Sequence, residues 1–190
     1  MAALDWALVR RVAVVGNSGS GKTALGRQLA SALGVRFVEL DAIYHQPDWE
    51  PLPREVFRRR VAEIVAEDAW VVDGNYSAVR DLVLARADTM VWLDLSRLTV
   101  TRQIVWRTLS RAITRAELWN GNRESWRAVL SRDPAKSIIL WSWTRHTRYR
   151  ERYANLTADP SYAHLNVLRI SSTSQAQRLV RAVAANAPAG

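Results

Sequence analysis

Short apolar runs recur along the chain without the alternation of apolar and polar residues that marks a half-exposed strand. They are rich in Val, Leu and Ile and cover residues 11–15, 35–40, 70–72, 90–95 and 167–170. Runs of this length and character are typical of strands that are buried on both faces, as in a parallel sheet. The pattern therefore predicts five buried strands.

Between these runs the apolar period changes to that of amphipathic helices. Over residues 22–33 a Leu recurs at every fourth position and Gly34 follows, which predicts a helix with a glycine stop. Further helices are predicted from Pro53, over residues 98–113 and over residues 134–153. A last helix begins at a capping box formed by Ser172 and Gln175.

Alternation of strands and helices predicts an α/β protein with three layers, in which helices cover both faces of a parallel five-stranded sheet. The 190 residues suit one domain, and no linker divides residues 1–190. The chain has no Cys, which excludes disulfides, thiolate zinc sites and a cysteine nucleophile. No apolar run approaches the ~18 residues of a membrane span, and the N-terminus lacks a signal-peptide pattern. We therefore expect a cytoplasmic protein without a membrane partner.

Positive charge is concentrated in one segment. Residues 97–152 hold 13 basic and 4 acidic residues, so the net charge of this segment alone is +9, the same as the formal net charge of the whole chain. Such a segment is expected to meet anions, whether phosphates, nucleic acid or an acidic surface.

The clearest chemical motif occupies residues 16–23, Gly-Asn-Ser-Gly-Ser-Gly-Lys-Thr, between a predicted strand and a predicted helix. This is the P-loop pattern G-x-x-x-x-G-K-[ST] in its required context. Its glycines let backbone N–H groups point at phosphate oxygens, Lys22 reaches the β- and γ-phosphates, and the Thr23 hydroxyl coordinates Mg²⁺. The fold class is therefore a P-loop NTPase fold. The expected nucleotide-binding residues are Gly16, Ser18, Gly19, Ser20, Gly21, Lys22 and Thr23.

Acidic residues follow the predicted strands, where ligands bind in open α/β sheets. Asp73 comes after Trp-Val-Val and is expected to hold Mg²⁺ through water, or else to form an Asx turn before Gly74. Asp41 is expected to open an aromatic-rich loop, where it could accept a proton from an acceptor hydroxyl or serve as a cap. Asp94 is expected to be structural.

Arginines in the basic segment share helix faces. Arg107, Arg111 and Arg115 are spaced by four, and Arg123 follows in a polar stretch. We expect residues 114–132 to form a short helical lid in which Arg111, Arg115 and Arg123 stabilise charge during transfer, while Arg107 contacts the nucleotide. A second arginine face, at positions 145, 148 and 152, would support closure. The alternative is a solvated arginine-rich helix face.

Six of the nine tryptophans fall into two groups. Those at positions 106, 126, 141 and 143 lie in helical patterns and are expected in the core. Trp49 and Trp119 lie in predicted loops and could contact a base or a substrate ring, although packing is the simpler role even for these two.

The chain resembles the small P-loop nucleoside and nucleotide kinases related to adenylate kinase, and looks closest to the bacterial branch called DNA topology modulation protein. The resemblance rests on residues 16–23, on Leu-Asp-Ala-Ile-Tyr at 40–44 with Trp49, on Trp-Val-Val-Asp-Gly-Asn-Tyr at 70–76, and on Trp-Leu-Asp at 92–94. It implies a five-stranded parallel sheet, ATP with Mg²⁺, an acceptor pocket near Asp41 and Asp73, and a lid with arginines.

Together these features predict a Mg-ATP-dependent phosphotransferase that moves the γ-phosphate to a small-molecule acceptor, with a nucleoside or nucleotide favoured. The catalytic residues would be Lys22, Asp41, Arg111, Arg115 and Arg123, and the metal residues Thr23 and Asp73. A nucleic-acid-associated or purely regulatory NTP-binding protein is the alternative.

Overall fold

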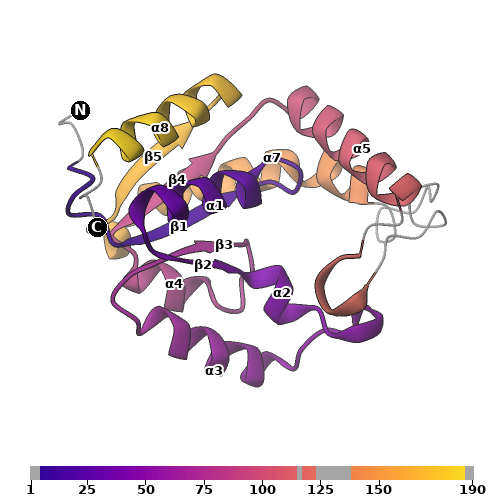
Figure 1. The fold of residues 1–190 in the computed structure, drawn as a ribbon, viewed down its shortest axis with the longest axis horizontal. Coiled ribbons are helices and arrows are strands. Elements are labelled where there is room, and N and C mark those ends of the chain that lie inside the picture. The colour runs from indigo at the N-terminus through magenta and orange to yellow at the C-terminus, as the bar shows by residue number, and fades with distance from the viewer. Residues whose placement is uncertain (1–4, 115–116, 123–137, 187–190) are drawn as a thin grey trace.

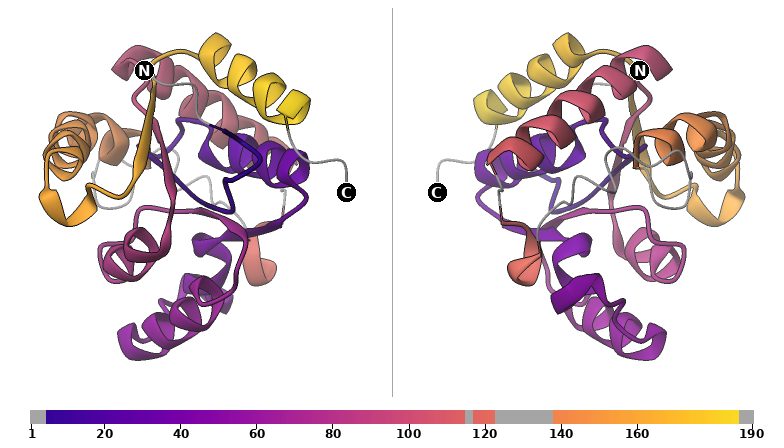
Figure 2. Two further views of the ribbon diagram at one scale, coloured as in Figure 1. Left: turned by 90° about the vertical axis from the view of Figure 1, so that its left-hand side faces the viewer. Right: turned by 90° about the vertical axis from the view of Figure 1, so that its right-hand side faces the viewer.

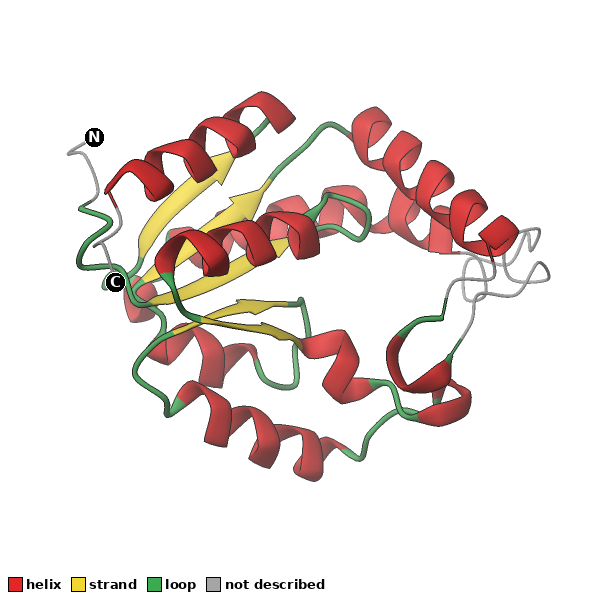
Figure 3. Ribbon diagram, in the orientation of Figure 1, coloured by secondary structure: helices red, strands yellow, loops and turns green. Residues whose placement is uncertain are grey.

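A computed structural model describes residues 5–114, 117–122 and 138–186. Five parallel strands form one sheet in the order β2-β3-β1-β4-β5 (Figures 1 and 3). The strands are β1 (Arg11–Gly16), β2 (Arg36–Glu39), β3 (Trp70–Asp73), β4 (Thr89–Leu93) and β5 (Asn166–Ile170). All five predicted strands are thus present, and the parallel sheet is confirmed. The edge strands β2 and β5 are only partly buried, so the prediction that all five are buried is wrong for these two.

Seven described helices accompany the sheet, together with three short 3₁₀ turns. The helices are α1 (Lys22–Leu33), α2 (Leu40–Tyr44), α3 (Arg54–Val65), α4 (Arg80–Arg86), α5 (Arg97–Thr114), α7 (Ile138–Thr157) and α8 (Thr173–Asn186). The turns are η1 (Pro47–Trp49), η2 (Trp119–Gly121) and η3 (Pro160–Tyr162). The sequence pattern did not predict α4, and Asp41 lies in the short helix α2 instead of opening a loop.

Alternate residues of each strand face opposite sides of the sheet, which produces two cores. Val12 and Val14 of β1 pack with residues of α1 and α8, whereas Ala13 and Val15 face α3, α4 and α7. The two turned views show these helices on opposite sides of the sheet (Figure 2). The predicted three-layer α/β/α arrangement is therefore confirmed.

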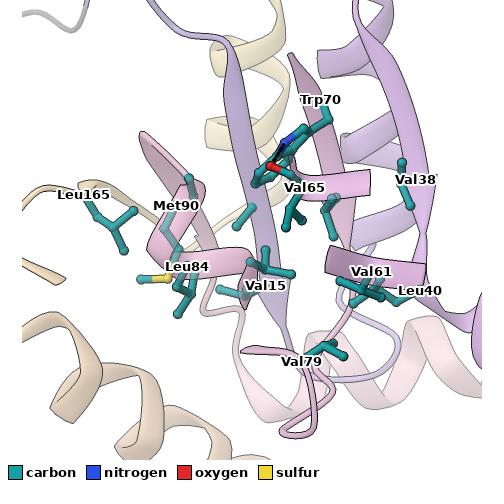
Figure 4. Packing of buried hydrophobic residues seen from close by; sticks show 14 of the residues in the cluster. Val15, Val38, Leu40, Val61, Val65, Trp70, Val79, Leu84, Met90 and Leu165 are labelled. Carbon is teal, nitrogen blue, oxygen red and sulfur yellow. Dashed lines mark hydrogen bonds between the residues drawn. The ribbon is translucent and has the colours of Figure 1, made fainter. Parts of the chain in front are cut away.

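The larger core surrounds Trp70, which is fully buried and donates from Nε1 to the carbonyl of Val65 at 3.4 Å. Met90 and Leu84 lie in the same cluster (Figure 4). Trp106, by contrast, is 76% exposed on α5, so its predicted place in the core is wrong.

Trp143, which was also expected in the core, is exposed as well. The side chains of the tryptophans at 126 and 141 lie outside the described residues. None of the described helices is long and apolar enough to cross a membrane.

The register of the sheet fixes the position of the site. Asp73 at the end of β3 pairs with Val14 of β1 on one side and with Glu39 of β2 on the other. The carboxyl ends of the three strands therefore deliver the P-loop and two carboxylates to one edge of the sheet, the edge at which open α/β proteins bind ligands.

Candidate active site

The loop after β1 is wrapped so tightly that two of its positions need glycine. A Cβ on Gly16, at φ +148°, would lie 2.6 Å from the carbonyl oxygen of Leu93 on β4. A Cβ on Gly19, at φ +79°, would lie 2.9 Å from Cβ of Ile104 on α5. The loop is thus packed between β4 and α5 and can keep its N–H groups directed at a phosphate.

The N-terminus of α1 continues the loop. The helix begins at Lys22 with no side-chain cap and no acidic residue in its first turn, which leaves its positive end available to an anion. Lys22 Nζ donates to the carbonyl of Asn17 at 3.1 Å, so its amine lies folded over the loop. Ser20 Oγ is buried without a hydrogen-bond partner among the described residues, as expected of a group that meets a ligand.

Asn75 joins the loop to the strand beside it. Its Oδ1 accepts from the N–H of Gly16 at 3.3 Å, and its Nδ2 donates to the carbonyl of the same glycine. Tyr153 of α7 donates to Asn75 Oδ1 at 2.8 Å. The Asp-Gly-Asn-Tyr segment therefore fixes the first residue of the P-loop, a role that the sequence analysis did not assign.

Three oxygen-bearing side chains converge beside Lys22. Thr23 Oγ1 donates to Asp73 Oδ2 at 2.5 Å and lies 3.2 Å from Glu39 Oε1. Burial raises the pKa of Asp73, while Lys22 and the hydrogen bond from Thr23 oppose this shift. Glu39 is an additional site residue that the sequence analysis missed, although its place at the end of a strand was the available signal.

This cluster fits the Mg²⁺ that accompanies a nucleotide in P-loop proteins. Magnesium prefers oxygen ligands and keeps several waters, and the hydroxyl of Thr23 with the carboxylate of Asp73 supplies such oxygens. Asp73 Oδ1 is buried and has no hydrogen-bond partner among the described residues, so it retains an acceptor for a metal-bound water. Thr23 and Asp73 are the residues that would hold the ion.

A second polar group lies further along the same edge. Tyr76 donates its hydroxyl to Asp41 Oδ1 at 2.6 Å, and His45 Nε2 lies 3.3 Å from the same hydroxyl. Burial and the neighbouring carboxylate raise the pKa of Tyr76. Burial lowers the pKa of His45, which Asp41 partly opposes. Asp41 is thereby held as a hydrogen-bonded carboxylate, and Tyr76 and His45 are further residues that the sequence analysis missed.

Trp49 and Trp119 meet beside this group although 70 positions separate them. Their ring centroids are 6.3 Å apart in an edge-to-face arrangement, and each ring also contacts that of His45. Both tryptophans were predicted in loops. They lie in the turns η1 and η2.

The predicted arginines are only partly described. Arg107 lies on α5. The side chain of Arg111, and Arg115 and Arg123 entirely, lie outside the described residues, as does most of the predicted lid at 114–132. Their assigned roles stay predictions. Asp94 pairs with Arg150 and Arg169, which fits its expected structural role.

The fold, the P-loop and the Thr23–Asp73 pair together place the protein in the P-loop class of α/β nucleotide-binding proteins. The family model "Shikimate kinase" matches residues 18–184. The chain therefore belongs to the shikimate kinase family, whose members use ATP with Mg²⁺. The resemblance to a P-loop kinase is confirmed, whereas the finer place in the DNA topology modulation branch stays a prediction.

Individual relatives agree with this family. The shikimate kinase of Symbiobacterium thermophilum is 35% identical over 98 residues, which cover 44% of this chain and 56% of the relative. Shikimate kinase 2 of Yersinia enterocolitica is 36% identical over 63 residues, which cover 33% and 31% of the two chains. The chain thus matches between about a third and just over half of these curated relatives' length.

Solved structures share the fold over more than nine tenths of the chain. A shikimate kinase from Acinetobacter baumannii, solved in complex with shikimate, has a TM-score of 0.54 at 18% identity and covers 97% of this chain and 98% of its own. A gluconokinase from Sinorhizobium meliloti has a TM-score of 0.50 at 20% identity and covers 93% and 90%. At these identities the likeness shows the fold.

Proposed function

We propose that the protein transfers the γ-phosphoryl group of Mg-ATP to a hydroxyl group of a small hydroxylated metabolite that binds beside Asp41. The observation that carries this proposal is the arrangement of two carboxylates with different partners at one sheet edge. Asp73 is tied to the P-loop threonine, and Asp41 is tied to Tyr76. Asp73 suits the nucleotide side of a transfer reaction, and Asp41 suits the acceptor side.

The nucleotide side would act by position and charge. When bound, Mg-ATP supplies the phosphoryl group and a metal ion that neutralises charge on its oxygens. The backbone between Gly16 and Gly21 would cradle the phosphates, with the N-terminus of α1 behind it. Lys22 would leave the carbonyl of Asn17 to meet the phosphates, because its amine is already at the rim of the loop.

The acceptor side would handle the proton. A hydroxyl oxygen of the acceptor forms a bond to the γ-phosphorus while the bond from that phosphorus to the β–γ bridging oxygen breaks. The hydroxyl proton passes to the carboxylate of Asp41, and ADP leaves with the bridging oxygen. Tyr76 would orient Asp41 throughout, since its hydrogen bond of 2.6 Å holds one carboxylate oxygen in place.

A hydroxylated metabolite is favoured over the nucleoside or nucleotide suggested by the sequence. The relatives are named for shikimate, and the gluconokinase neighbour for gluconate, which are hydroxylated carboxylates without a base. The family match therefore supports a hydroxylated metabolite without a base as the acceptor.

Phosphate transfer from γ-labelled ATP to a panel of acceptors tests the proposal. The panel holds shikimate, gluconate, neutral sugars, polyols, nucleosides and nucleoside monophosphates. We expect transfer to at least one acceptor that is neither a nucleoside nor a nucleotide. This transfer should be lost in Lys22→Ala and kept in Arg36→Ala. Arg36 is exposed, pairs with Glu67 and begins β2, at the end of the strand away from Glu39. Transfer to nucleosides or nucleotides alone, or to no acceptor, would overturn the proposal.

A further inference from the structure

The segment 118–122 is joined to the loop after α2 by two asparagine side chains. Asn122 is 5% exposed. Its Oδ1 accepts from the N–H of Trp49 at 2.9 Å, and its Nδ2 donates to the carbonyls of Gln46 at 2.8 Å and Trp119 at 2.9 Å. Asn120 donates to the carbonyls of Ala42 and His45. The amide of Asn122 therefore works as a cross-link between two segments that are far apart in sequence.

Non-glycine backbone strain within the described part of the chain lies at this junction. Within the described residues, the non-glycine positions with a positive φ are Asp48 at 58°, Trp49 at 61° and Asn120 at 56°. A non-glycine residue in this region costs roughly 1–3 kcal/mol and persists only where the surroundings impose it. Such strain clusters at ligand sites, because it orients side chains that an unstrained loop would direct elsewhere.

Aromatic rings at and beside these strained positions form one surface. The ring of His45 stacks on that of Trp119 at 6.0 Å and 21°, and the ring of Trp49 meets His45 edge-on at 5.3 Å. We call these three rings the aromatic wall. His45 also reaches the Tyr76 hydroxyl that holds Asp41, so the wall adjoins the proposed acceptor carboxylate. Trp49 is 38% exposed, whereas a tryptophan that served only to fill the core would be buried.

We infer that the aromatic wall binds the flat apolar face of a ring-shaped hydroxylated acceptor, and that Asn122 is the positioning residue that assembles this wall. The inference rests on the proposed function, because it takes Asp41 as the group that receives the acceptor's proton. A ring of carbon atoms offers one face of C–H groups to aromatic side chains and its hydroxyls to a carboxylate. An open chain of similar size offers no such face and loses more conformational freedom on binding.

The inference also explains why the two tryptophans come from different segments. Trp49 follows the helix that carries Asp41, and Trp119 is carried by the segment that Asn122 anchors. Binding of the acceptor against both would need the anchored arrangement. Loss of the anchor should therefore weaken acceptor binding while the P-loop, which lies on other elements, still binds ATP.

The test compares ring acceptors (shikimate, myo-inositol and D-glucose) with chain acceptors (D-gluconate and D-sorbitol). It uses the wild type, Trp119→Leu, Asn122→Ala and the control Trp106→Leu, whose ring is exposed on α5 and outside the wall. We expect the wild type to prefer ring acceptors. Trp119→Leu and Asn122→Ala should each raise the acceptor KM by about tenfold, the scale of one aromatic contact, and leave the ATP KM unchanged.

Several results would overturn the inference while leaving the proposed function intact. One is a preference for chain acceptors. Another is an unchanged acceptor KM in both wall variants. A third is an equal rise in the KM for ATP, which would mean that the residues act only on the fold. The control variant should match the wild type in each measurement.

Binding measurements test the aromatic wall separately from the proposed function when no phosphate transfer is seen. If the wild type transfers phosphate to none of the probes, the proposed function fails for them, and quenching of tryptophan fluorescence by the same probes tests the wall directly. Quenching by ring acceptors that is lost in Trp119→Leu and kept in Trp106→Leu would support the wall. Absence of quenching would overturn it as well.

Discussion

At the scale of single residues, Asp73 serves two demands that oppose each other. Its carboxylate is 3% exposed, and burial raises its pKa, which means that the charged form is costly in the folded chain. The same charge is what a magnesium ion requires. The hydrogen bond from Thr23 and the nearby Lys22 recover part of the cost. The residue is thus held in its functional state at the expense of stability.

Replacement of Asp73 by Asn should move activity and stability in opposite directions. The amide keeps an acceptor for Thr23 and removes the buried charge, so we expect a larger free energy of unfolding at neutral pH, measured by urea titration without metal. Activity should fall by about 10–100-fold, the usual effect of losing a group that orients a metal through its water. Lower stability together with full activity would contradict this assignment.

The lowered pKa of His45 makes the folded chain less stable as the pH falls. Burial lowers its pKa in the folded chain, whereas the unfolded chain titrates near 6.5. As the pH falls below 6.5 the unfolded chain binds the proton first, so the wild type loses stability on the way down to the lowered folded pKa.

His45→Gln removes this titration and keeps a polar group near Tyr76. We expect the free energy of unfolding of the wild type to decrease relative to that of His45→Gln as the pH is lowered from above to below 6.5. Urea titrations on either side of that pH measure the difference. A gap that stays constant, or that moves in favour of the wild type in acid, would contradict a lowered pKa of His45.

At the scale of elements, the packing of α5 against the P-loop determines what the loop can tolerate. Gly19 has a φ of +79° and no room for a Cβ beside Ile104, whereas Gly34 has a φ of +66° and open space around it. A comparison of substitutions at Gly19 and Gly34 therefore distinguishes the cost of backbone strain, present at both, from the cost of steric contact, present only at Gly19.

Gly19→Ala should therefore be worse than Gly34→Ala. Strain alone costs roughly 1–3 kcal/mol in either variant. The contact with Ile104 adds to this only at Gly19, where it also displaces the loop. We expect an increase in the ATP KM for Gly19→Ala and none for Gly34→Ala, measured by initial rates at saturating acceptor. Equal effects of the two substitutions would contradict the packing described.

Elements whose character is set by local pattern could be predicted from the sequence, and those set by distant contacts could not. The helix over 22–33 has both its bounds as predicted, since Leu at every fourth position and Gly34 act locally. Helix α4 is only seven residues long and gives too short a pattern. Trp106 follows the helical period yet stays exposed, because the face of α5 that bears it meets no other described element.

The site shows the same division. Residues 16–23 could be assigned from the motif, and Asp73 from its place after a strand. The hydrogen bond of Tyr76 to Asp41 joins residues 35 positions apart. The hydrogen bond between Asn122 and Trp49 joins residues 73 positions apart. No local spacing encodes such pairs. They emerge only when the parallel strands bring their carboxyl ends together.

At the scale of the whole molecule, charge is unevenly spread. The positive excess lies in residues 97–152, beyond the strand β4, and the first half of the chain is close to neutral. In a kinase this charge meets the phosphates of a nucleotide and the developing charge of transfer. In a nucleic-acid-binding protein it would instead follow a phosphate backbone.

A salt titration distinguishes these uses of the charge. We expect a labelled DNA duplex or RNA strand to bind weakly, and the binding measured by fluorescence anisotropy to vanish well below about 150 mM salt, because attraction between arginines and phosphates alone is nonspecific. Tight binding that persists at that salt concentration would favour the nucleic-acid-associated alternative.

The central claim is that one sheet edge holds a nucleotide side at Thr23 and Asp73 and an acceptor side at Asp41. The most direct test is single-turnover phosphate transfer by Asp41→Asn, with the exposed Asp68→Asn as the matched control. We predict that transfer to the best acceptor slows by about 10²–10⁴-fold, as for loss of a general base, while the Kd for ATP stays at the wild-type value. Transfer at the wild-type rate, or an equal loss of ATP binding, would contradict the account.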